Sequence, residues 1–298
     1  QSGFFNGFTT GTPLCARIVN SDQHSKDYSI LADKMRPGHA DYAGHVRYQG
    51  FNDYRGGGHF SGRLTAPLVF AGAVAKQALA QHGIVVGSHI LQINDIQEER
   101  FNPMGVSDAE LAELHAKKFA VMDDTVGEKM QERILQAKSE LNSVGGVVEA
   151  IALHLPAGIG APYFDSVESM LSHALFSVPA VKGIEFGDGF GFAGLTGAEA
   201  NDALHYVDGK VLALTNHNGG VTGGITNGMP LVVRVAIKPT PSIAREQQTV
   251  SLKEQADTIL AIVGRHDPCI VQRAVPVIEA VVAWTLWDLL LEAKKWEK

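Results

Sequence analysis

Segments with helical spacing of apolar residues alternate along this chain with β-like runs, and glycine-rich loops separate them. The helical periodicity predicts four helices: Ala66–His82, Asp108–Lys118, Thr125–Val144 and Ala274–Lys298. Runs rich in apolar and β-branched residues predict five strands: Pro13–Val19, Ile84–Ile93, Gly146–Leu155, Val181–Phe186 and Leu231–Ile237. No Pro/Gly/Ser linker divides the chain. The pattern is that of an α+β or α/β protein with a single domain over residues 1–298.

Two of the predicted helices carry signals at their ends. Ser107 precedes the second helix as an N-cap, since its hydroxyl can accept a hydrogen bond from the first turn. Gly145 and Gly146 follow the third helix, and glycine is typical of a helix C-terminus. We therefore expect the third helix to run to Val144.

A weak internal repeat relates the two ends of the chain. Residues 9–17 match residues 226–234 at Thr, Gly, Pro, Leu and Arg, and two arginines and a proline lead into both the first and the last predicted helix. Two related halves would place a site at their interface. Chance is the alternative, because turns before strands favour the same residues.

Charge and cysteine content exclude some classes of partner and scaffold. The formal net charge is −7 and the one short basic run is Lys294-Lys295, whereas nucleic-acid binding requires a clustered basic face. Cys15 and Cys269 are far apart, which argues against a disulfide scaffold and fits a reducing cytoplasm. Three acidic residues interrupt the apolar stretch Ala274–Ala293, which favours a buried helix over a membrane span.

The stretch that points most directly to chemistry is Arg36-Pro37-Gly38-His39-Ala40-Asp41-Tyr42. His39 can take and give a proton near neutral pH, and Arg36 is a permanent cation whose forked donors suit carboxylates and phosphates. Pro37 fixes its own φ, and Gly38 permits a turn that other residues resist. We predict that the backbone of this turn holds the His39 side chain in one defined orientation. The alternative is a surface turn with an ordinary histidine.

Two glycine-dense segments are candidates for ligand contact. Gly56–Arg63 comes directly before a predicted helix, where backbone N–H groups and the helix N-terminus favour an anion. Its alternative is a flexible turn. Asn216–Gly228 contains five glycines and three asparagines, which suit close backbone contact to a flat polar ligand. Its alternative is a structural hairpin.

Two shorter segments could also bind an anion or move a proton. Lys238-Pro239-Thr240-Pro241-Ser242 follows a predicted strand and offers an ammonium group and hydroxyls. Arg265-His266-Asp267-Pro268 precedes the last helix, where Asp267 is either a base or the helix N-cap. Gly189–Gly194 matches the dinucleotide fingerprint only formally, because no acidic residue follows at the expected distance. No Cys/His spacing supports zinc.

Together these segments resemble the chorismate synthase family. The family motifs are matched in order by Arg36–Tyr42, Asp53–Arg63, Val181–Gly189, Asn218–Ile225, Lys238–Ser242 and Arg265–Pro268. The resemblance implies an α+β fold of the β-α-β sandwich type, with two pseudo-equivalent halves around a helical layer, assembled as a homotetramer. It implies conversion of 5-enolpyruvylshikimate 3-phosphate to chorismate and phosphate by a 1,4-anti elimination, which requires reduced FMN without net redox change.

The resemblance also implies roles for individual residues. His39 matches a histidine thought to protonate the reduced flavin, and Asp267 matches an acidic residue that could relay a proton through it. Arg36 and Arg63 match substrate-binding residues, and Arg265 matches a cofactor-binding one. The other implied flavin contacts are His59, Phe60, Ser61, Ala180, Gly223, Lys238, Pro239, Thr240, Pro241 and Ser242. Nothing resembles an NADPH-binding domain, so we expect an external flavin reductase to supply reduced flavin.

The chain departs from the family pattern in two places. Many family members carry an arginine where His59 stands, and a histidine weakens the local cation at higher pH. The family's Gly-Glu-Ser-His-Gly stretch and the arginines after it have no counterpart, so we expect an N-terminally incomplete chain. Two other hypotheses stay open. One is a catalytically impaired flavin- or anion-binding fragment of the family, and the other is a phosphosugar-binding enzyme without flavin.

Overall fold

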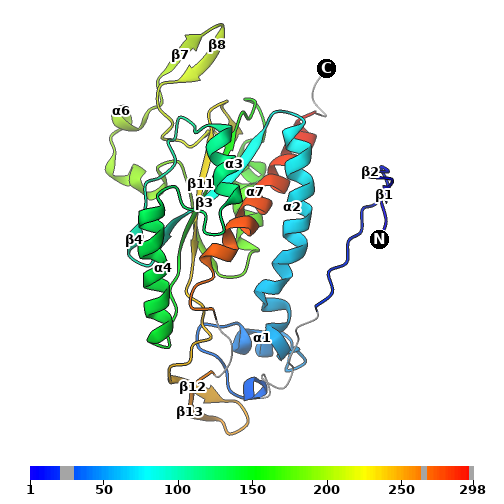
Figure 1. The fold of residues 1–298 in the computed structure, drawn as a ribbon, viewed down its shortest axis with the longest axis vertical. Helices are drawn as coiled ribbons and strands as arrows, with labels where there is room; N and C mark the ends of the chain where they lie inside the picture. The colour runs from blue at the N-terminus through cyan, green and yellow to red at the C-terminus, as the bar shows by residue number, and fades with distance from the viewer. Residues whose placement is uncertain (21–29, 263–266, 295–298) are drawn as a thin grey trace.

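A five-stranded antiparallel sheet forms the centre of this computed structural model, which describes residues 1–20, 30–262 and 267–294 (Figure 1). The strand order is β4 (Ile96–Gln97), β3 (Val85–Ile93), β5 (Gly146–Leu153), β11 (Leu231–Ile237) and β6 (Val181–Phe186). Four predicted strands are therefore confirmed, and β6 and β11 match their predicted bounds at both ends. With the helices that flank the sheet, the fold is α+β, as predicted.

The last helix, α7 (Val271–Lys294), packs directly on β3 and β5. It is long and apolar enough to span a membrane, but 72% of its apolar window is buried inside the protein, which confirms the predicted buried helix. α2 (Thr65–Ala80) lies alongside α7 (Figure 1), and a Cβ at Gly72 would lie 2.2 Å from that of Ala280. Glycine therefore permits this close approach of the two helices. α5 (Val167–Phe176) packs against α7 and β6.

The opposite face of the sheet carries a second, smaller core under α3 (Asp108–Ala116). Its buried residues are Phe101, Leu111, Leu114, Ile151, Leu153 and Val232. Ser107 caps α3 as predicted, because its hydroxyl accepts from the Glu110 N–H while the Glu110 carboxylate accepts from the Ser107 N–H. α4 (Asp124–Ser139) packs at the β3–β4 edge.

The prediction that the third helix runs to Val144 is wrong, because α4 ends at Ser139. Leu141 closes the helix in the left-handed conformation, with φ 57°, and the next N–H group bonds back across the last turn as in a Schellman motif. Gly146 is needed for the sheet: a Cβ there would lie 1.9 Å from the carbonyl oxygen of Gln92 on β3. This glycine therefore permits the β3–β5 pairing and does not end the helix.

The predicted first strand, Pro13–Val19, is also wrong. The chain instead starts with a short hairpin of β1 (Phe4–Phe5) and β2 (Phe8–Thr9), and Cys15 makes only an isolated bridge to Ser2. This hairpin lies away from the sheet (Figure 1), so the strand pattern has no neighbour with which to form a ladder. In the proposed repeat the end of β2 matches the end of β10, but no strand in the first copy corresponds to β11.

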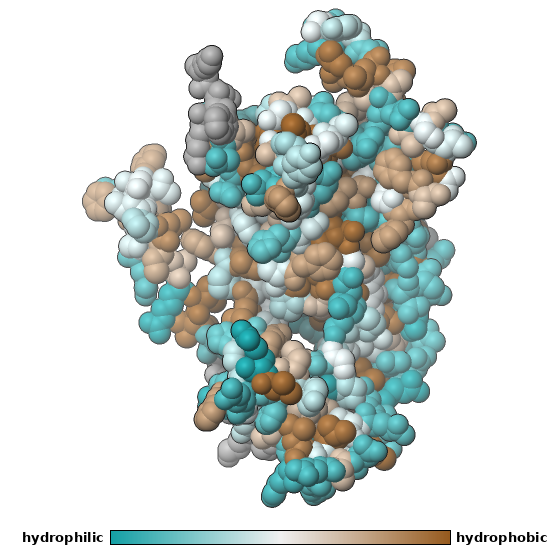
Figure 2. All heavy atoms as spheres, turned by 180° about the vertical axis from the view of Figure 1, so that it is seen from behind, coloured by the Kyte–Doolittle hydropathy of each residue, from teal (hydrophilic) through white to brown (hydrophobic). Residues whose placement is uncertain are grey.

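Several small elements surround the core, and the sequence predicted none of them except a hairpin within Asn216–Gly228, which was the alternative interpretation of that segment. They are α1 (Asp41–Arg47), η2 (Arg55–Phe60), η3 (Gly62–Leu64), η4 (Tyr163–Asp165), η5 (Gly189–Gly194), α6 (Gly197–Ala200), and the hairpins β7–β8 (Leu204–Val207, Lys210–Ala213), β9–β10 (Val221–Thr222, Ile225–Thr226) and β12–β13 (Gln247–Ser251, Ala256–Leu260). The β7–β8 hairpin stands away from the body (Figure 1). Apolar side chains gather on it (Figure 2), and Leu204 is 71% exposed.

Candidate active site

Predicted site residues converge at the end of β11 that leads into Lys238. The Arg36–Asp41 turn packs on Lys238–Ser242, because the Lys238 ammonium donates to the Gly38 carbonyl and Arg36 Nη1 donates to Ser242 Oγ at 3.2 Å. The β12–β13 hairpin also holds the turn, since the backbone N–H of Met35 donates to the Val250 carbonyl at 3.3 Å. Two motifs about 200 residues apart in sequence are thus neighbours in the fold.

His39 is fixed in one orientation within this turn. Its Nδ1 lies 2.6 Å from Oδ1 of Asp41 and 3.1 Å from Nη2 of Arg36, and its side chain is 15% exposed. The other ring nitrogen, Nε2, faces Gly57, where a Cβ would lie 3.8 Å from it. The turn therefore holds the ring as predicted, while a role in proton transfer stays a prediction.

Asp41 ties Arg36 to His39. Its carboxylate accepts from the Arg36 backbone N–H at 3.1 Å, from Nε at 2.7 Å and from Nη2 at 2.8 Å. Burial alone would raise the pKa of Asp41, but the hydrogen bonds from Arg36 and His39 outweigh it and hold the pKa well below its ordinary value. Asp41 is therefore ionised. All three guanidinium nitrogens of Arg36 are engaged, and substrate binding by this arginine stays a prediction.

The first glycine-dense segment lies beside His39 as η2. Gly57 and Gly58 have positive φ angles of 84° and 51°, a conformation that favours glycine. Phe60 packs on α1, where a Cβ at Gly44 would lie 2.6 Å from the ring of Phe60. Ser61 caps η3 with its hydroxyl. The segment therefore presents backbone, and not bulky side chains, to the imidazole.

The basic side chains of this segment face solvent. His59 and Arg63 are both exposed. Arg55 is engaged by Asp53 through Nε and Nη2, each at 2.8 Å, and these hydrogen bonds lower the pKa of Asp53 to about 2. A phosphate could approach the exposed side chains of His59 and Arg63, and their binding roles stay predictions.

The Lys238–Ser242 segment is fixed on its other side by the loops before β5 and β6. The Lys238 N–H donates to the carbonyl of Ala180 at 2.9 Å, and Ala180 has the positive φ of 75° that is unusual outside glycine. Ser143 Oγ donates to the Thr240 carbonyl at 2.7 Å. Pro241 lies against the His39 turn, where a Cβ at Gly38 would lie 3.6 Å from it. Ala180 and Lys238–Ser242 thus join the same cluster.

Asp267 lies near this cluster and does not cap the last helix. α7 begins at Val271, and the carboxylate of Asp267 pairs with Arg273 Nη1 at 2.7 Å. The next carbonyl, of Pro268, accepts from the Val144 N–H at 2.8 Å, which places this stretch beside the loop that contacts Thr240. Arg265 lies outside the described residues.

The second glycine-dense segment lies at the opposite end of β11. The Val232 N–H at that end donates to the Gly219 carbonyl at 3.1 Å, and the seven-residue strand between the two ends spans about 20 Å. Gly223 is exposed, with φ 61° and nothing within 4 Å of a Cβ. The structure therefore brings His39, Gly57 and Lys238 together but does not place Gly223 with them.

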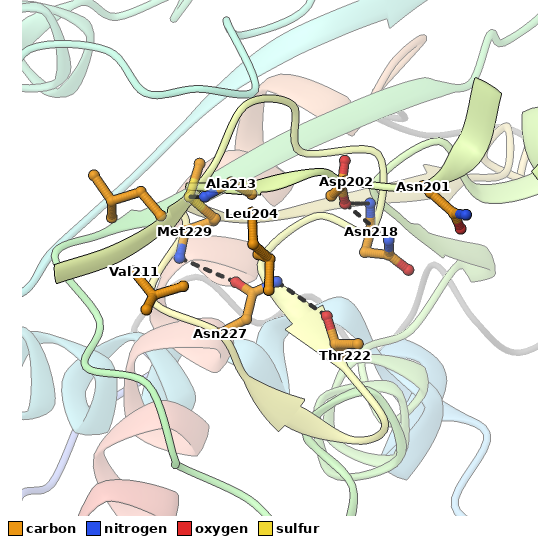
Figure 3. A pocket seen from close by; sticks show the side chains of 10 residues that line it. Asn201, Asp202, Leu204, Val211, Ala213, Asn218, Thr222, Asn227 and Met229 are labelled. Atoms are coloured by element: carbon orange, nitrogen blue, oxygen red, sulfur yellow. Dashed lines mark hydrogen bonds between the residues drawn. The ribbon is translucent and has the colours of Figure 1, made fainter. Parts of the chain in front are cut away.

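This segment lines a cavity of about 340 Å³ together with the β7–β8 hairpin (Figure 3). The lining residues are Asn201, Asp202, Leu204, Val211, Leu212, Ala213, Asn218, Thr222, Asn227 and Met229. Most of the polar groups satisfy one another: Asn227 Nδ2 donates to Thr222 Oγ1 at 3.0 Å, and Asn218 Nδ2 donates to Asp202 at 2.8 Å. The cavity is thus a separate feature from the His39 cluster.

Two aspartates that the sequence did not single out hold the glycine-dense segment in place. Asp202 accepts from the backbone N–H groups of His217 and Asn218 at 2.8 and 3.0 Å. Burial would raise the pKa of Asp202, but hydrogen bonds from the Asn218 side chain and from the Asn218 and His217 backbone N–H groups lower it. Asp188 pairs with Nδ1 of His217 at 2.6 Å. Asp188 lay inside a quoted motif, yet nothing in the sequence identified its partner.

Comparison with known proteins gives a consistent result. A protein-family model described as chorismate synthase matches residues 1–291. The chain is 48% identical over 297 residues to the chorismate synthase of Thermococcus gammatolerans and 46% identical over 296 residues to that of Pyrococcus abyssi, covering 99% of this chain and 81% of each relative. A solved structure described as a crystal structure of chorismate synthase superposes with a TM-score of 0.69 at 30% identity, covering 85% of this chain and 70% of that one.

Proposed function

Because the chain belongs to the chorismate synthase family, we propose that it is a carbon–oxygen lyase that converts 5-enolpyruvylshikimate 3-phosphate to chorismate and phosphate. In this 1,4-anti elimination the C–O bond to phosphate and one C–H bond break, a second ring double bond forms, and phosphate and a proton leave. There is no net oxidation or reduction. The observation that supports the proposal is His39, held by Asp41 and facing Gly57 beside Lys238–Ser242.

We propose reduced FMN as the cofactor, and the residues around His39 fit such a group. Gly57 has no side chain, whereas a Cβ there would already touch His39 Nε2 at 3.8 Å, so glycine keeps this nitrogen from being covered by a larger side chain. Lys238 has no carboxylate partner among the described residues, which leaves its charge for an anion. When bound, reduced FMN supplies an electron transiently as phosphate leaves and regains it afterwards.

The protein's own groups would then bind anions and hold protons. Lys238 and the hydroxyls of Thr240 and Ser242, with the backbone of His59–Ser61, would hold the cofactor. Arg63 would bind the anionic substrate, since a permanent cation stabilises the charge that develops on the departing phosphate. His39 would hold a proton at Nε2, on the side that faces the glycine-rich segment.

The position of Gly223 supports the proposed homotetramer. It lies at the far end of β11 from Lys238, so it reaches a cofactor held at Lys238 only from another copy of the chain. The β7–β8 hairpin beside it exposes apolar side chains suited to such a contact, including Leu204 and Val211. We further propose a cytoplasmic enzyme of the shikimate pathway that receives reduced flavin from an external reductase.

The test is an anaerobic assay with reduced FMN and 5-enolpyruvylshikimate 3-phosphate, following chorismate absorbance and phosphate release. We expect both products in equal amounts, and none with oxidised FMN. His39→Ala should lower kcat by about 10²–10⁴-fold while FMN affinity stays within about threefold. His173→Ala, at an exposed position on α5, is the matched control and should leave kcat unchanged.

Two outcomes would count against the proposal. FMN binding without chorismate would indicate an impaired flavin-binding member of the family. Failure to bind FMN would overturn the assignment of the His39 cluster as the cofactor site.

A further inference from the structure

We propose that Asp41 is a positioning residue for His39, which holds the imidazole with a proton on Nδ1 and thereby leaves Nε2 to face the glycine-rich segment. The proposal rests on the proposed function, because His39 serves the reaction only if that function is right. The geometric part of the proposal concerns His39 and Asp41 themselves and can be measured without turnover.

Two groups compete for Nδ1 of His39. Asp41 Oδ1, which can only accept a hydrogen bond, lies 2.6 Å away, and Arg36 Nη2, which can only donate one, lies 3.1 Å away. A proton on Nδ1 satisfies Asp41, whereas a bare Nδ1 would satisfy Arg36. A carboxylate oxygen and a bare ring nitrogen 2.6 Å apart would repel each other, so a hydrogen must lie between them. Arg36 Nη2 already donates to Asp41 Oδ1 at 2.8 Å and does not need His39.

The hydrogen in question must come from the imidazole. Asp41 is 7% exposed and ionised, because it receives three hydrogen bonds from Arg36. Two of these, from the backbone N–H and from Nε, end on Oδ2 and fix the plane of the carboxylate. Its other oxygen, Oδ1, is thereby aimed at His39.

This arrangement determines which nitrogen is available for chemistry. With Nδ1 committed to Asp41, Nε2 is the nitrogen that gains and loses a proton, and it faces Gly57. The charged and titratable groups near the ring are Arg36 and Asp41 in its own turn, Lys238 after β11, and the exposed His59 on η2. Among these, Asp41 is the group that accepts from the ring.

An Asp41→Asn variant should reverse the tautomer. The carboxamide must place its oxygen at the Oδ2 position, because two Arg36 donors converge there. Its NH₂ group then faces His39 Nδ1 and donates to it, so the neutral ring carries its proton on Nε2. The same substitution in a catalytic triad leaves the geometry intact but produces the wrong tautomer.

The tautomer is read from the ¹⁵N shifts of the imidazole nitrogens in the uniformly labelled chain near pH 9, where an ordinary imidazole is neutral. His39→Gln identifies the signals among the twelve histidines. We expect a protonated Nδ1 in the native chain and an unprotonated Nδ1 in Asp41→Asn. Asp53→Asn is the control, because Asp53 receives the same three hydrogen bonds from Arg55 but makes no hydrogen bond to a histidine within the described part of the chain, and it should leave the His39 shifts unchanged.

An unprotonated Nδ1 in the native chain would overturn the proposal, even if Asp41→Asn failed to fold. An unchanged tautomer in folded Asp41→Asn would overturn it as well. In the chorismate assay we expect kcat of Asp41→Asn to fall at least about 10²-fold, with KM within about threefold. If the native chain makes no chorismate, the proposed function fails, while the ¹⁵N shifts still decide the role of Asp41.

Discussion

Glu149 on β5 lies directly opposite Arg234 on β11, with 3.3 Å between Oε1 and Nη1, and both side chains are at most 4% exposed. The pair belongs to a row of register partners across four strands: His89, Glu149, Arg234 and Glu185. Arg234 also donates to Glu185 at 2.7 Å and to the Gly187 carbonyl. The row therefore ties β3, β5, β11 and β6 together within the smaller core.

We expect Arg234→Met to lower the free energy of unfolding by about 3–5 kcal/mol, because it removes the buried guanidinium that pairs with both Glu149 and Glu185 and leaves two carboxylates to be shared by His89 and backbone N–H groups. Urea unfolding followed by circular dichroism would measure the change. Asp124→Asn is the control: Asp124 pairs with Lys117 at 2.8 Å but is 80% exposed, and loss of that pair should cost about 1 kcal/mol or less. Equal losses in the two variants would contradict the assignment of a buried network.

We expect His89 to make stability fall at alkaline pH. Burial would lower the pKa of His89, but its hydrogen bonds with Glu149 and Glu98 outweigh this and raise the pKa above 6.5. A group whose pKa is higher in the folded than in the unfolded protein stabilises the fold fully below its unfolded-state pKa. This stabilisation is lost as the pH rises through the folded-state pKa. The free energy of unfolding should therefore decline from about pH 6.5 upward, and less steeply in His89→Gln. Parallel declines in urea titrations of both proteins would show that His89 is not responsible.

We expect Gly146→Ala to disrupt the centre of the sheet. Its Cβ would lie 1.9 Å from the Gln92 carbonyl, so β3 and β5 would have to separate. A loss of more than about 3 kcal/mol in the free energy of unfolding should result, at the upper end of what single substitutions do. Gly197→Ala, at the start of α6 with nothing within 4 Å, should change it by no more than about 1 kcal/mol. If thermal unfolding showed similar midpoints for the two variants, the close contact would be refuted.

We expect one fast-reacting thiol in the native chain. Cys15 is exposed, whereas Cys269 is 1% exposed and burial raises its pKa to about 11. Since the thiolate is the reactive form, only Cys15 should react with an aromatic disulfide reagent at pH 8. Cys15→Ser should abolish the fast phase, and both thiols should react in denaturant. A fast phase that persists in Cys15→Ser would mean that Cys269 is accessible.

The central strands could be predicted because they are nearly continuous apolar runs. β11 is buried along almost its whole length between two neighbouring strands, so its composition identifies it. β6 is the edge strand and is mostly half-buried, and the run Val181–Phe186 before a glycine-rich loop identified it despite its Lys and Glu. Pro13–Val19 has a similar composition but no partner strand, and a strand is stable only through its neighbours. The strands of the β12–β13 hairpin are mostly polar or exposed and contain few apolar residues, so the sequence showed no apolar run that would predict them.

The candidate site was predictable where its geometry is local. The turn that holds Arg36, His39 and Asp41 spans six residues, and the residue types alone predicted that it orients the histidine. The contact between Arg36 and Ser242 could not be read from the sequence, because it depends on how β11 and the β12–β13 hairpin are placed. Asp41 was quoted within this motif but was not predicted as a site residue, because its pairing with Arg36 and His39 depends on side-chain geometry that residue types do not specify.

The contact of Arg36 with Ser242, 206 residues later in the chain, has a consequence for biosynthesis. When His39 leaves the ribosome, the segments that support its turn have not yet been translated. At about 5–20 residues per second, the ribosome needs about 10–40 s to complete them. During that interval the histidine lies on a nascent chain without its support, so a polypeptide that is released early could acquire much of the sheet and still lack a formed catalytic turn.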